Sequence, residues 1–185
     1  MVMVSFTAVA NGITFMRLAS VPWVIWVLLE GYHETAFILF VVMAITDAID
    51  GSIARLAKEA NQIGAYMDPF ADKVLLVSVY VFFASTNAVP LWLVLFVVFR
   101  DVLLMFSLAL NQVLEQKKAL LPPILSSKIN TFSQFVLAAI VMAQQAFVIL
   151  PLPLYEQCIL IGSVIVAATT AFSGAFYMRL WWFKN

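Results

Sequence analysis

Residues 47–72 read DAIDGSIARLAKEANQIGAYMDPFAD, and this segment carries four aspartates at helical spacings in an otherwise apolar chain. Asp47 and Asp50 are three residues apart and Asp68 and Asp72 are four apart, so each pair shares one face of a helix. Carboxylates in or beside a membrane are costly, and four of them ionised together would repel one another. Magnesium removes that repulsion, because it binds carboxylates while keeping water and phosphate oxygens as ligands. Two such ions can clamp a transferring phosphoryl group, so the segment predicts a two-metal site for a phosphate-bearing substrate.

The rest of the chain is strongly apolar: 64% of its 185 residues are hydrophobic and only 11% are charged. A soluble domain is nearer half apolar and a quarter charged, so the composition predicts an integral membrane protein with an all-α fold. At about 20 apolar residues per crossing, we expect six transmembrane helices in a single domain over residues 1–185. They lie near residues 13–30, 35–56, 65–85, 89–110, 123–149 and 153–178. The zero net charge argues against nucleic-acid binding.

The charged residues predict an orientation for this bundle. All ten Lys and Arg residues can be placed on one side of the membrane, whereas the opposite loops hold Glu30, His33, Glu34 and Glu156. The positive-inside rule then puts both termini and the four aspartates on the cytoplasmic side, which is the matrix side in a mitochondrial membrane.

Small residues and one arginine accompany the aspartates. Gly51 and Ala54 follow the first two aspartates by one turn, so they clear side-chain bulk from that face and let a pyrophosphate approach the backbone. Arg55 can bind a phosphate bidentately, and Gly64 opens the second helix on the same side. One acid near a membrane surface is usually solvated, and one glycine is often a packing notch. Those explanations do not account for four acids, two glycines and one arginine that recur at regular helical spacings.

The pattern D-x2-D-G-x2-A-R-x8-G-x3-D-x3-D resembles the motif of the CDP-alcohol phosphotransferase family and matches it at every fixed position. The resemblance implies that Asp47, Asp50 and Asp68 bind two divalent ions, Mg²⁺ or Mn²⁺, and that Asp72 is both a ligand and the general base. It also implies a set of residues that hold the CDP-lipid: Gly51, Ala54, Arg55 and Gly64, with Asn61 as a further contact.

The same resemblance implies a fold and a location. Members of this family form six membrane helices around a polar cavity that faces the cytosol, usually as homodimers. We therefore expect a protein of the bacterial inner (plasma) membrane or of a mitochondrial-type inner membrane, surrounded by membrane lipids and using CDP-diacylglycerol as donor.

Three other segments bear on the acceptor alcohol. The first is Asn11-Gly-Ile-Thr14-Phe-Met-Arg17. It resembles the N-x-x-T/S-x-x-R pattern that precedes the first membrane helix of bacterial phosphatidylglycerophosphate synthases and cardiolipin synthases. Asn11 and Thr14 would contact the donor. Arg17 would bind the acceptor or serve only as a topology anchor.

The second segment begins with Arg100-Asp101, which is either a structural ion pair or a means of aiming the arginine at an acceptor phosphate. The third, Ser127-Lys128-Ile-Asn130-Thr-Phe-Ser-Gln134, places polar residues on a partly shared helix face that we do not expect to meet lipid. Both segments resemble CMP-forming cardiolipin synthases more than phosphatidylglycerophosphate synthases. The small residues of 168–177, taken alone, predict close helix packing.

We therefore expect an enzyme that transfers a phosphatidyl group from CDP-diacylglycerol to phosphatidylglycerol, giving cardiolipin and CMP. A singly charged lipid acceptor needs few basic groups, and the acceptor candidates are correspondingly sparse: Lys73, Arg100, Lys128, Asn130 and Arg17. The alternative is a phosphatidylglycerophosphate synthase that uses glycerol 3-phosphate. A remote alternative is a divalent-cation transporter, because acids in membrane helices also mark transport pathways.

Overall fold

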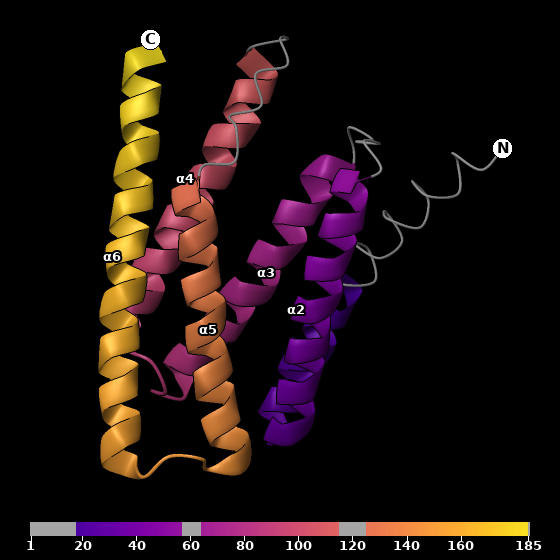
Figure 1. The fold of residues 1–185 in the computed structure, drawn as a ribbon, viewed down its shortest axis with the longest axis vertical. Coiled ribbons are helices and arrows are strands. Elements are labelled where there is room, and N and C mark those ends of the chain that lie inside the picture. Colours follow the sequence, from indigo (N-terminus) through magenta and orange to yellow (C-terminus); the bar gives the residue numbers. More distant parts are fainter. Residues whose placement is uncertain (1–17, 57–63, 115–124, 185) are drawn as a thin grey trace, which may run out of the picture. The chain divides into compact units, whose positions relative to one another are not determined.

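The computed structural model describes the backbone of residues 18–56, 64–114 and 125–184, and the side chains of residues 18–46, 73–105, 125–176 and 179. Within these ranges the chain forms helices and no strand, so the predicted all-α fold is confirmed. The first helix is described over Leu18–Leu29. It is followed by α2 (His33–Leu56), α3 (Gly64–Ser85), α4 (Leu91–Leu114), α5 (Leu125–Phe147) and α6 (Leu152–Lys184) (Figure 1).

Backbone conformation at two residues explains where the first helix and α3 end. Gly31 has φ of 83°, and the N–H groups of Gly31 and Tyr32 donate to the carbonyls of Leu28 and Val27 at 3.1 Å each. This is the paired hydrogen bonding of a Schellman cap, in which glycine takes the left-handed position without steric cost. Asn87, with φ of 55°, takes the equivalent position after α3, and asparagine is among the few other residues that tolerate it.

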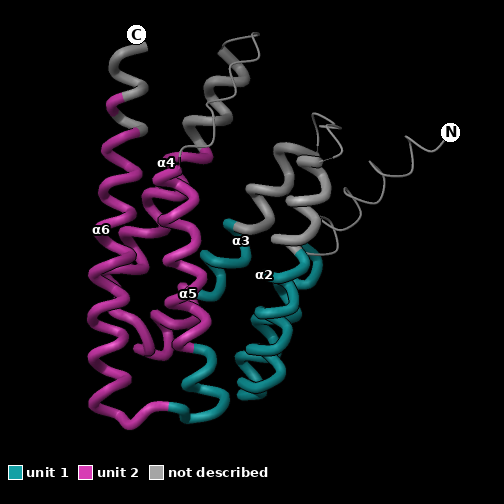
Figure 2. The backbone as a smooth tube through the Cα atoms, viewed as in Figure 1, with its two compact units in different colours: residues 1–79, 142–149 teal, residues 80–141, 150–185 magenta. Residues whose placement is uncertain are grey.

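The chain divides into two compact units, which are residues 1–79 with 142–149 and residues 80–141 with 150–185 (Figure 2). In the first unit, Ser20 Oγ donates to Met43 Sδ at 3.5 Å, and the rings of Phe37 and Phe147 meet edge to face at 5.7 Å. In the second unit, α4 packs against α6. The single domain predicted over residues 1–185 stays a prediction.

Two of the helices are long and apolar enough to cross a membrane, judged on the residues whose side chains are described. They are α5 and the part of α6 from Leu152 to Phe176. Three shorter stretches are also apolar: Leu18–Leu29, His33–Thr46 and Lys73–Ser85. The helices thus lie close to the six predicted segments, but a membrane crossing by all six stays a prediction.

Large apolar side chains remain exposed along the helices of the second unit. Phe99 on α4, Phe132 on α5 and Leu160 on α6 are 63%, 70% and 64% exposed. Many further large apolar side chains of α4, α5 and α6 are exposed as well, such as Leu95, Phe172 and Val164. Such faces suit contact with lipid chains.

Among the described glycines, Gly162 on α6 has the least room for a side chain, because α5 lies close to it. A Cβ built at Gly162 would lie 2.8 Å from Leu137 Cδ1, and Leu137 is buried. A Cβ built at Gly174 on the same helix would meet only Arg100 Cγ, at 4.0 Å, which is ordinary van der Waals contact.

We therefore expect Gly162→Ala to lower the free energy of unfolding by about 1 kcal/mol relative to Gly174→Ala, because Leu137 Cδ1, the far end of a buried side chain, must shift to make room. The comparison cancels the helix propensity that each alanine adds. Unfolding of both variants by SDS in mixed micelles measures the difference. Equal stabilities would contradict the packing described here.

Candidate functional site

The four motif aspartates lie on two uninterrupted helices. Asp47 and Asp50 belong to α2, and Asp68 and Asp72 belong to α3. The backbone at both pairs is therefore helical, as the sequence predicted. At 3.6 residues per turn the members of each pair are separated by about 60° and 40° around their helix axes. The remaining motif residues also fall on these helices: Gly51, Ala54 and Arg55 on α2 and Gly64 at the start of α3.

All of these side chains lie outside the described part of the chain, so their contacts stay predictions. The donor set nevertheless fits a divalent ion such as Mg²⁺ or Mn²⁺. Four carboxylates from two helices of one compact unit provide the hard oxygen ligands that these ions prefer. The described side chains, which exclude these four, contain no group of three or more His, Cys, Asp or Glu residues suited to a metal.

Several other predicted residues also fall outside the description, namely Asn11, Thr14, Arg17 and Asn61. Lys73, directly after Asp72 on α3, is half-buried. Lys128, near the start of α5, is exposed. Their predicted contacts with the acceptor stay predictions.

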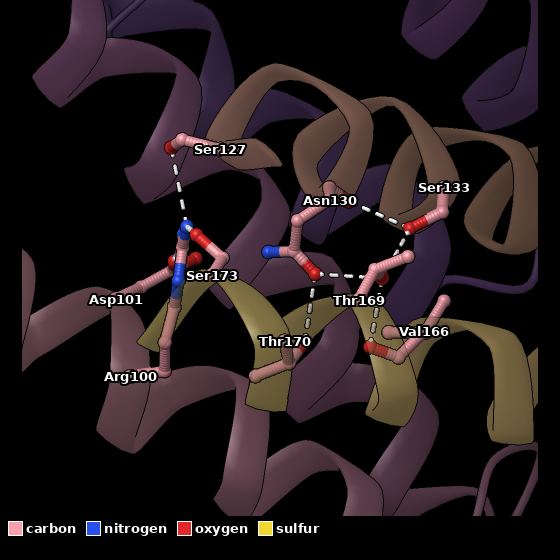
Figure 3. Close-up of polar contacts among 9 residues, drawn as sticks. All are labelled: Arg100, Asp101, Ser127, Asn130, Ser133, Val166, Thr169, Thr170 and Ser173. Atoms are coloured by element: carbon pink, nitrogen blue, oxygen red, sulfur yellow. Dashed lines mark hydrogen bonds and ion pairs between the residues drawn. The ribbon is translucent and has the colours of Figure 1, made fainter. Parts of the chain in front are cut away.

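Arg100 is the centre of a buried polar cluster that joins three helices of the second unit. Its Nη1 donates to Asp101 Oδ1 at 2.6 Å, and the two residues are only 4% and 1% exposed. Its Nη2 donates to Ser127 Oγ on α5 at 3.1 Å and to Ser173 Oγ on α6 (Figure 3). The sequence left open whether Arg100 forms a structural ion pair or binds an acceptor phosphate. The structure shows the ion pair with Asp101, and binding of the acceptor stays a prediction.

Asn130 forms a second node on α5. Its Oδ1 accepts hydrogen bonds from Thr169 Oγ1 at 3.0 Å and Thr170 Oγ1 at 2.8 Å, both on α6. Ser133 Oγ donates to the backbone carbonyl of Asn130 at 2.8 Å and lies 3.1 Å from Thr169 Oγ1. Asn130 and Gln134 are fully buried, as predicted for the polar face of this helix, whereas Lys128 of the same predicted face is exposed.

These two nodes lie one helical turn apart along α6. Thr170, which binds Asn130, precedes Ser173, which binds Arg100, by three residues. Figure 3 shows the amide nitrogen of Asn130 on the side of this network that faces Ser173 and Arg100. The structure thus places two of the predicted acceptor residues, Arg100 and Asn130, in neighbouring polar clusters against α6.

The sequence interpretation of the last helix was incomplete. Residues 168–177 were expected to serve close packing, but Thr169, Thr170 and Ser173 are hydrogen-bond partners of the two nodes. Their spacing contains a signal for this role, because residues at i, i+1 and i+4 place three hydroxyl groups on one side of an apolar helix.

Comparison with known proteins gives a family match over most of the chain. The family described as CDP-alcohol phosphatidyltransferase matches residues 7–175. A Drosophila melanogaster protein named "Probable cardiolipin synthase (CMP-forming)" is 36% identical over 98 residues, covering 52% of this chain and 30% of that protein.

Two further relatives cover more of the chain. The Rattus norvegicus protein named "Cardiolipin synthase (CMP-forming)" is 27% identical, covering 92% of this chain and 61% of the relative. The Cereibacter sphaeroides "CDP-diacylglycerol--glycerol-3-phosphate 3-phosphatidyltransferase" is 33% identical, covering 72% of this chain and 62% of the relative. The matched regions thus span between 30% and 62% of these three relatives.

Proposed function

Because the chain belongs to the CDP-alcohol phosphatidyltransferase family, we propose that it transfers a phosphatidyl group from CDP-diacylglycerol to a hydroxyl of phosphatidylglycerol. The products would be cardiolipin and CMP. Relatives named as CMP-forming cardiolipin synthases support this choice of acceptor, as do the sequence segments around Arg100 and Asn130.

The observation that carries the choice of acceptor is the charge balance at Arg100. Its guanidinium is paired with the carboxylate of Asp101, so the buried cluster has no net charge from this pair. A buried cation that is already compensated offers little to a doubly charged phosphate, because burying the extra negative charge is costly. A lipid acceptor with a single phosphodiester charge fits such a cluster better than glycerol 3-phosphate does.

In this proposal the donor binds at the motif on α2 and α3. Asp47, Asp50 and Asp68, together with Asp72, would hold the divalent ions, and Arg55 would bind a phosphate of the donor. Gly51, Ala54 and Gly64 would leave room for the pyrophosphate, with Asn61, Asn11 and Thr14 as further contacts. Bound divalent ions neutralise pyrophosphate charge and stabilise charge that develops on the transferring group.

The reaction itself needs one proton acceptor from the chain. Asp72 takes the proton from the acceptor hydroxyl, and the hydroxyl oxygen attacks the phosphorus on the lipid side of the donor pyrophosphate. A new P–O bond forms, the P–O bond to CMP breaks, and CMP leaves with the electron pair. Lys73, Arg100, Lys128, Asn130 and Arg17 would orient the acceptor.

The proposal includes the setting of the enzyme. We place it in a bacterial inner membrane or a mitochondrial-type inner membrane, with six crossings around a polar cavity that faces the cytoplasm or matrix, and as a homodimer. The exposed apolar side chains of α4, α5 and α6 support a lipid environment.

One assay tests the acceptor. Purified protein is given CDP-diacylglycerol and Mg²⁺ or Mn²⁺ with either phosphatidylglycerol or glycerol 3-phosphate, and the lipid product and CMP are quantified. We expect cardiolipin and CMP with phosphatidylglycerol, loss of both with EDTA, and recovery when the ion is restored.

Product with glycerol 3-phosphate alone would instead favour a phosphatidylglycerophosphate synthase, an alternative supported by the Cereibacter sphaeroides relative. A remote alternative is divalent-cation transport. Magnesium uptake into liposomes without CMP release would favour it and overturn the enzyme.

A further inference from the structure

The turn that joins α5 to α6 has no polar side chain. Its residues 147–154 read FVILPLPL and form the short connection between the two helices in Figure 1. Val148 and Leu152 are 75% and 67% exposed. The other described turns contain polar residues, among them exposed Glu30 and Asn87. Turns that face water are rich in glycine and in polar residues that bond to their own backbone, so this turn does not match a watery environment.

The backbone of the turn is strained at Val148. Its φ is 47°, a left-handed conformation that a β-branched residue rarely adopts because its Cβ crowds the backbone. The other two described residues with positive φ are Gly31 and Asn87, types that adopt it at lower cost. A valine at this position therefore needs a compensating gain, and its apolar side chain gains free energy only by leaving water. Because the chain itself leaves Val148 largely exposed, that gain must come from a partner outside the chain.

Most backbone N–H groups of the turn need no water. The Val148 N–H donates to the Gln144 carbonyl and the Leu154 N–H to the Pro151 carbonyl, each at 3.0 Å. Pro153, like Pro151, has no N–H to satisfy. Unpaired backbone groups are the main obstacle to placing irregular backbone against lipid, so contact with lipid costs this turn less than it would cost an ordinary one.

The turn also continues the apolar surface of the helices that it joins. α5 and the part of α6 from Leu152 to Phe176 are the described helices long and apolar enough to cross a membrane. On α6, Leu154, Leu160 and Ile161 follow the turn and are 51%, 64% and 60% exposed. The partner that covers the turn is therefore continuous with the one that covers these helices.

The length of α6 indicates how deep the turn lies. The rise from Leu152 to exposed Arg179 is about 40 Å at 1.5 Å per residue. A bilayer is about 40–45 Å thick with its headgroups and about 30 Å without them, so Leu152 and Arg179 fall in opposite headgroup layers. Exposed Glu156, one turn after Leu152, then lies at the edge of the hydrocarbon, where its carboxylate can still reach the headgroups.

We propose that residues 147–154 are buried among the phospholipids of one leaflet, at the level of the headgroups and the upper acyl chains. Phospholipid is the occupant because the turn presents apolar side chains without any charge and extends a surface that already suits lipid. The turn thus anchors that end of α5 and α6 in the membrane, whereas the turn at Glu30 lies in water.

A fluorophore placed in the turn tests this proposal. In a Cys158→Ser background, Ile149→Cys is labelled with the environment-sensitive dye NBD, and the intact chain is reconstituted into vesicles of phosphatidylcholine and phosphatidylglycerol. Matched vesicles contain phosphatidylcholine with a nitroxide on the upper part of one acyl chain, which quenches dyes near the headgroups. We expect the label at 149 to emit at short wavelength and to lose most of its fluorescence in the nitroxide vesicles.

Glu30→Cys, in the same background, is the control, because Glu30 is an exposed residue of a polar turn. Its label should emit as in water and lose little fluorescence. If the label at 149 behaves like this control, the turn lies in water and the proposal is overturned. A short-wavelength emission without quenching also overturns it, because protein, such as a second copy of the chain, then covers the turn.

Leu152→Cys provides a second position in the same turn. Both labels must be quenched, and quenching at only one of them overturns the assignment of the whole turn. Circular dichroism compares the helical content of each labelled chain with that of the unaltered chain, and if Ile149→Cys loses helix, Leu152→Cys decides alone. No substrate enters these measurements, so their outcome is independent of the proposed reaction.

Discussion

Asp72→Asn is expected to lower CMP release from CDP-diacylglycerol by about 10²–10⁴-fold, because a positioned general base contributes about that factor to a rate. Asparagine has nearly the same shape as aspartate but cannot accept the proton of the attacking hydroxyl. It also weakens one predicted ligand of the divalent ions, so the loss will lie toward the upper end of this range. CMP release in detergent micelles with phosphatidylglycerol as acceptor measures the effect.

Glu34→Gln is the matched control for this charge removal. Glu34 is exposed and lies in the first turn of α2, at the opposite end of that helix from Asp47 and Asp50. Its amide variant should keep full activity. If Asp72→Asn retained more than about a tenth of the rate, the assignment of Asp72 as general base would be wrong.

Arg100→Met is expected to lower the free energy of unfolding by about 3–5 kcal/mol, because it leaves the buried carboxylate of Asp101 without its cation. The double variant R100M/D101L removes both charges, and we expect it to recover most of that loss, since apolar residues often replace a buried ion pair at little cost. Unfolding by SDS in mixed micelles measures the single and double variants, and the same substitution at exposed Arg179 is the control.

The activity of the double variant tests whether Arg100 orients the acceptor. If Arg100 orients the acceptor as proposed, R100M/D101L folds but the KM for phosphatidylglycerol stays raised. A double variant with recovered stability and a normal KM would limit Arg100 to a structural role. An Arg100→Met protein as stable as the control would contradict the buried ion pair itself.

The sequence predicted the helices well because their ends are set locally. Gly31 and Asn87 terminate helices through backbone geometry that those residue types favour, and the apolar runs between such points are long. The motif spacing likewise depends only on helix periodicity, so Asp47, Asp50, Asp68 and Asp72 fall on helices as predicted.

The partners of Arg100 and Asn130 could not be predicted in the same way. The sequence indicates which sides of α5 and α6 carry polar side chains, but it does not specify which residue of one helix meets which residue of the other. The pairing of Asn130 with Thr169 and Thr170 depends on the rotation of α5 against α6, which side-chain packing sets. The close approach at Gly162 is part of that packing and became visible only in three dimensions.

The positions of the Arg100 contacts along the chain determine the order in which they form during synthesis. Its ion pair lies within α4 between adjacent residues, so the two charges can compensate each other as soon as that helix has been synthesised. Ser127 and Ser173 emerge from the ribosome later, and Ser173 belongs to α6. The guanidinium therefore gains its hydrogen bond to Ser173 only when α6 docks, so assembly of this cluster waits for a helix that is made long after the ion pair.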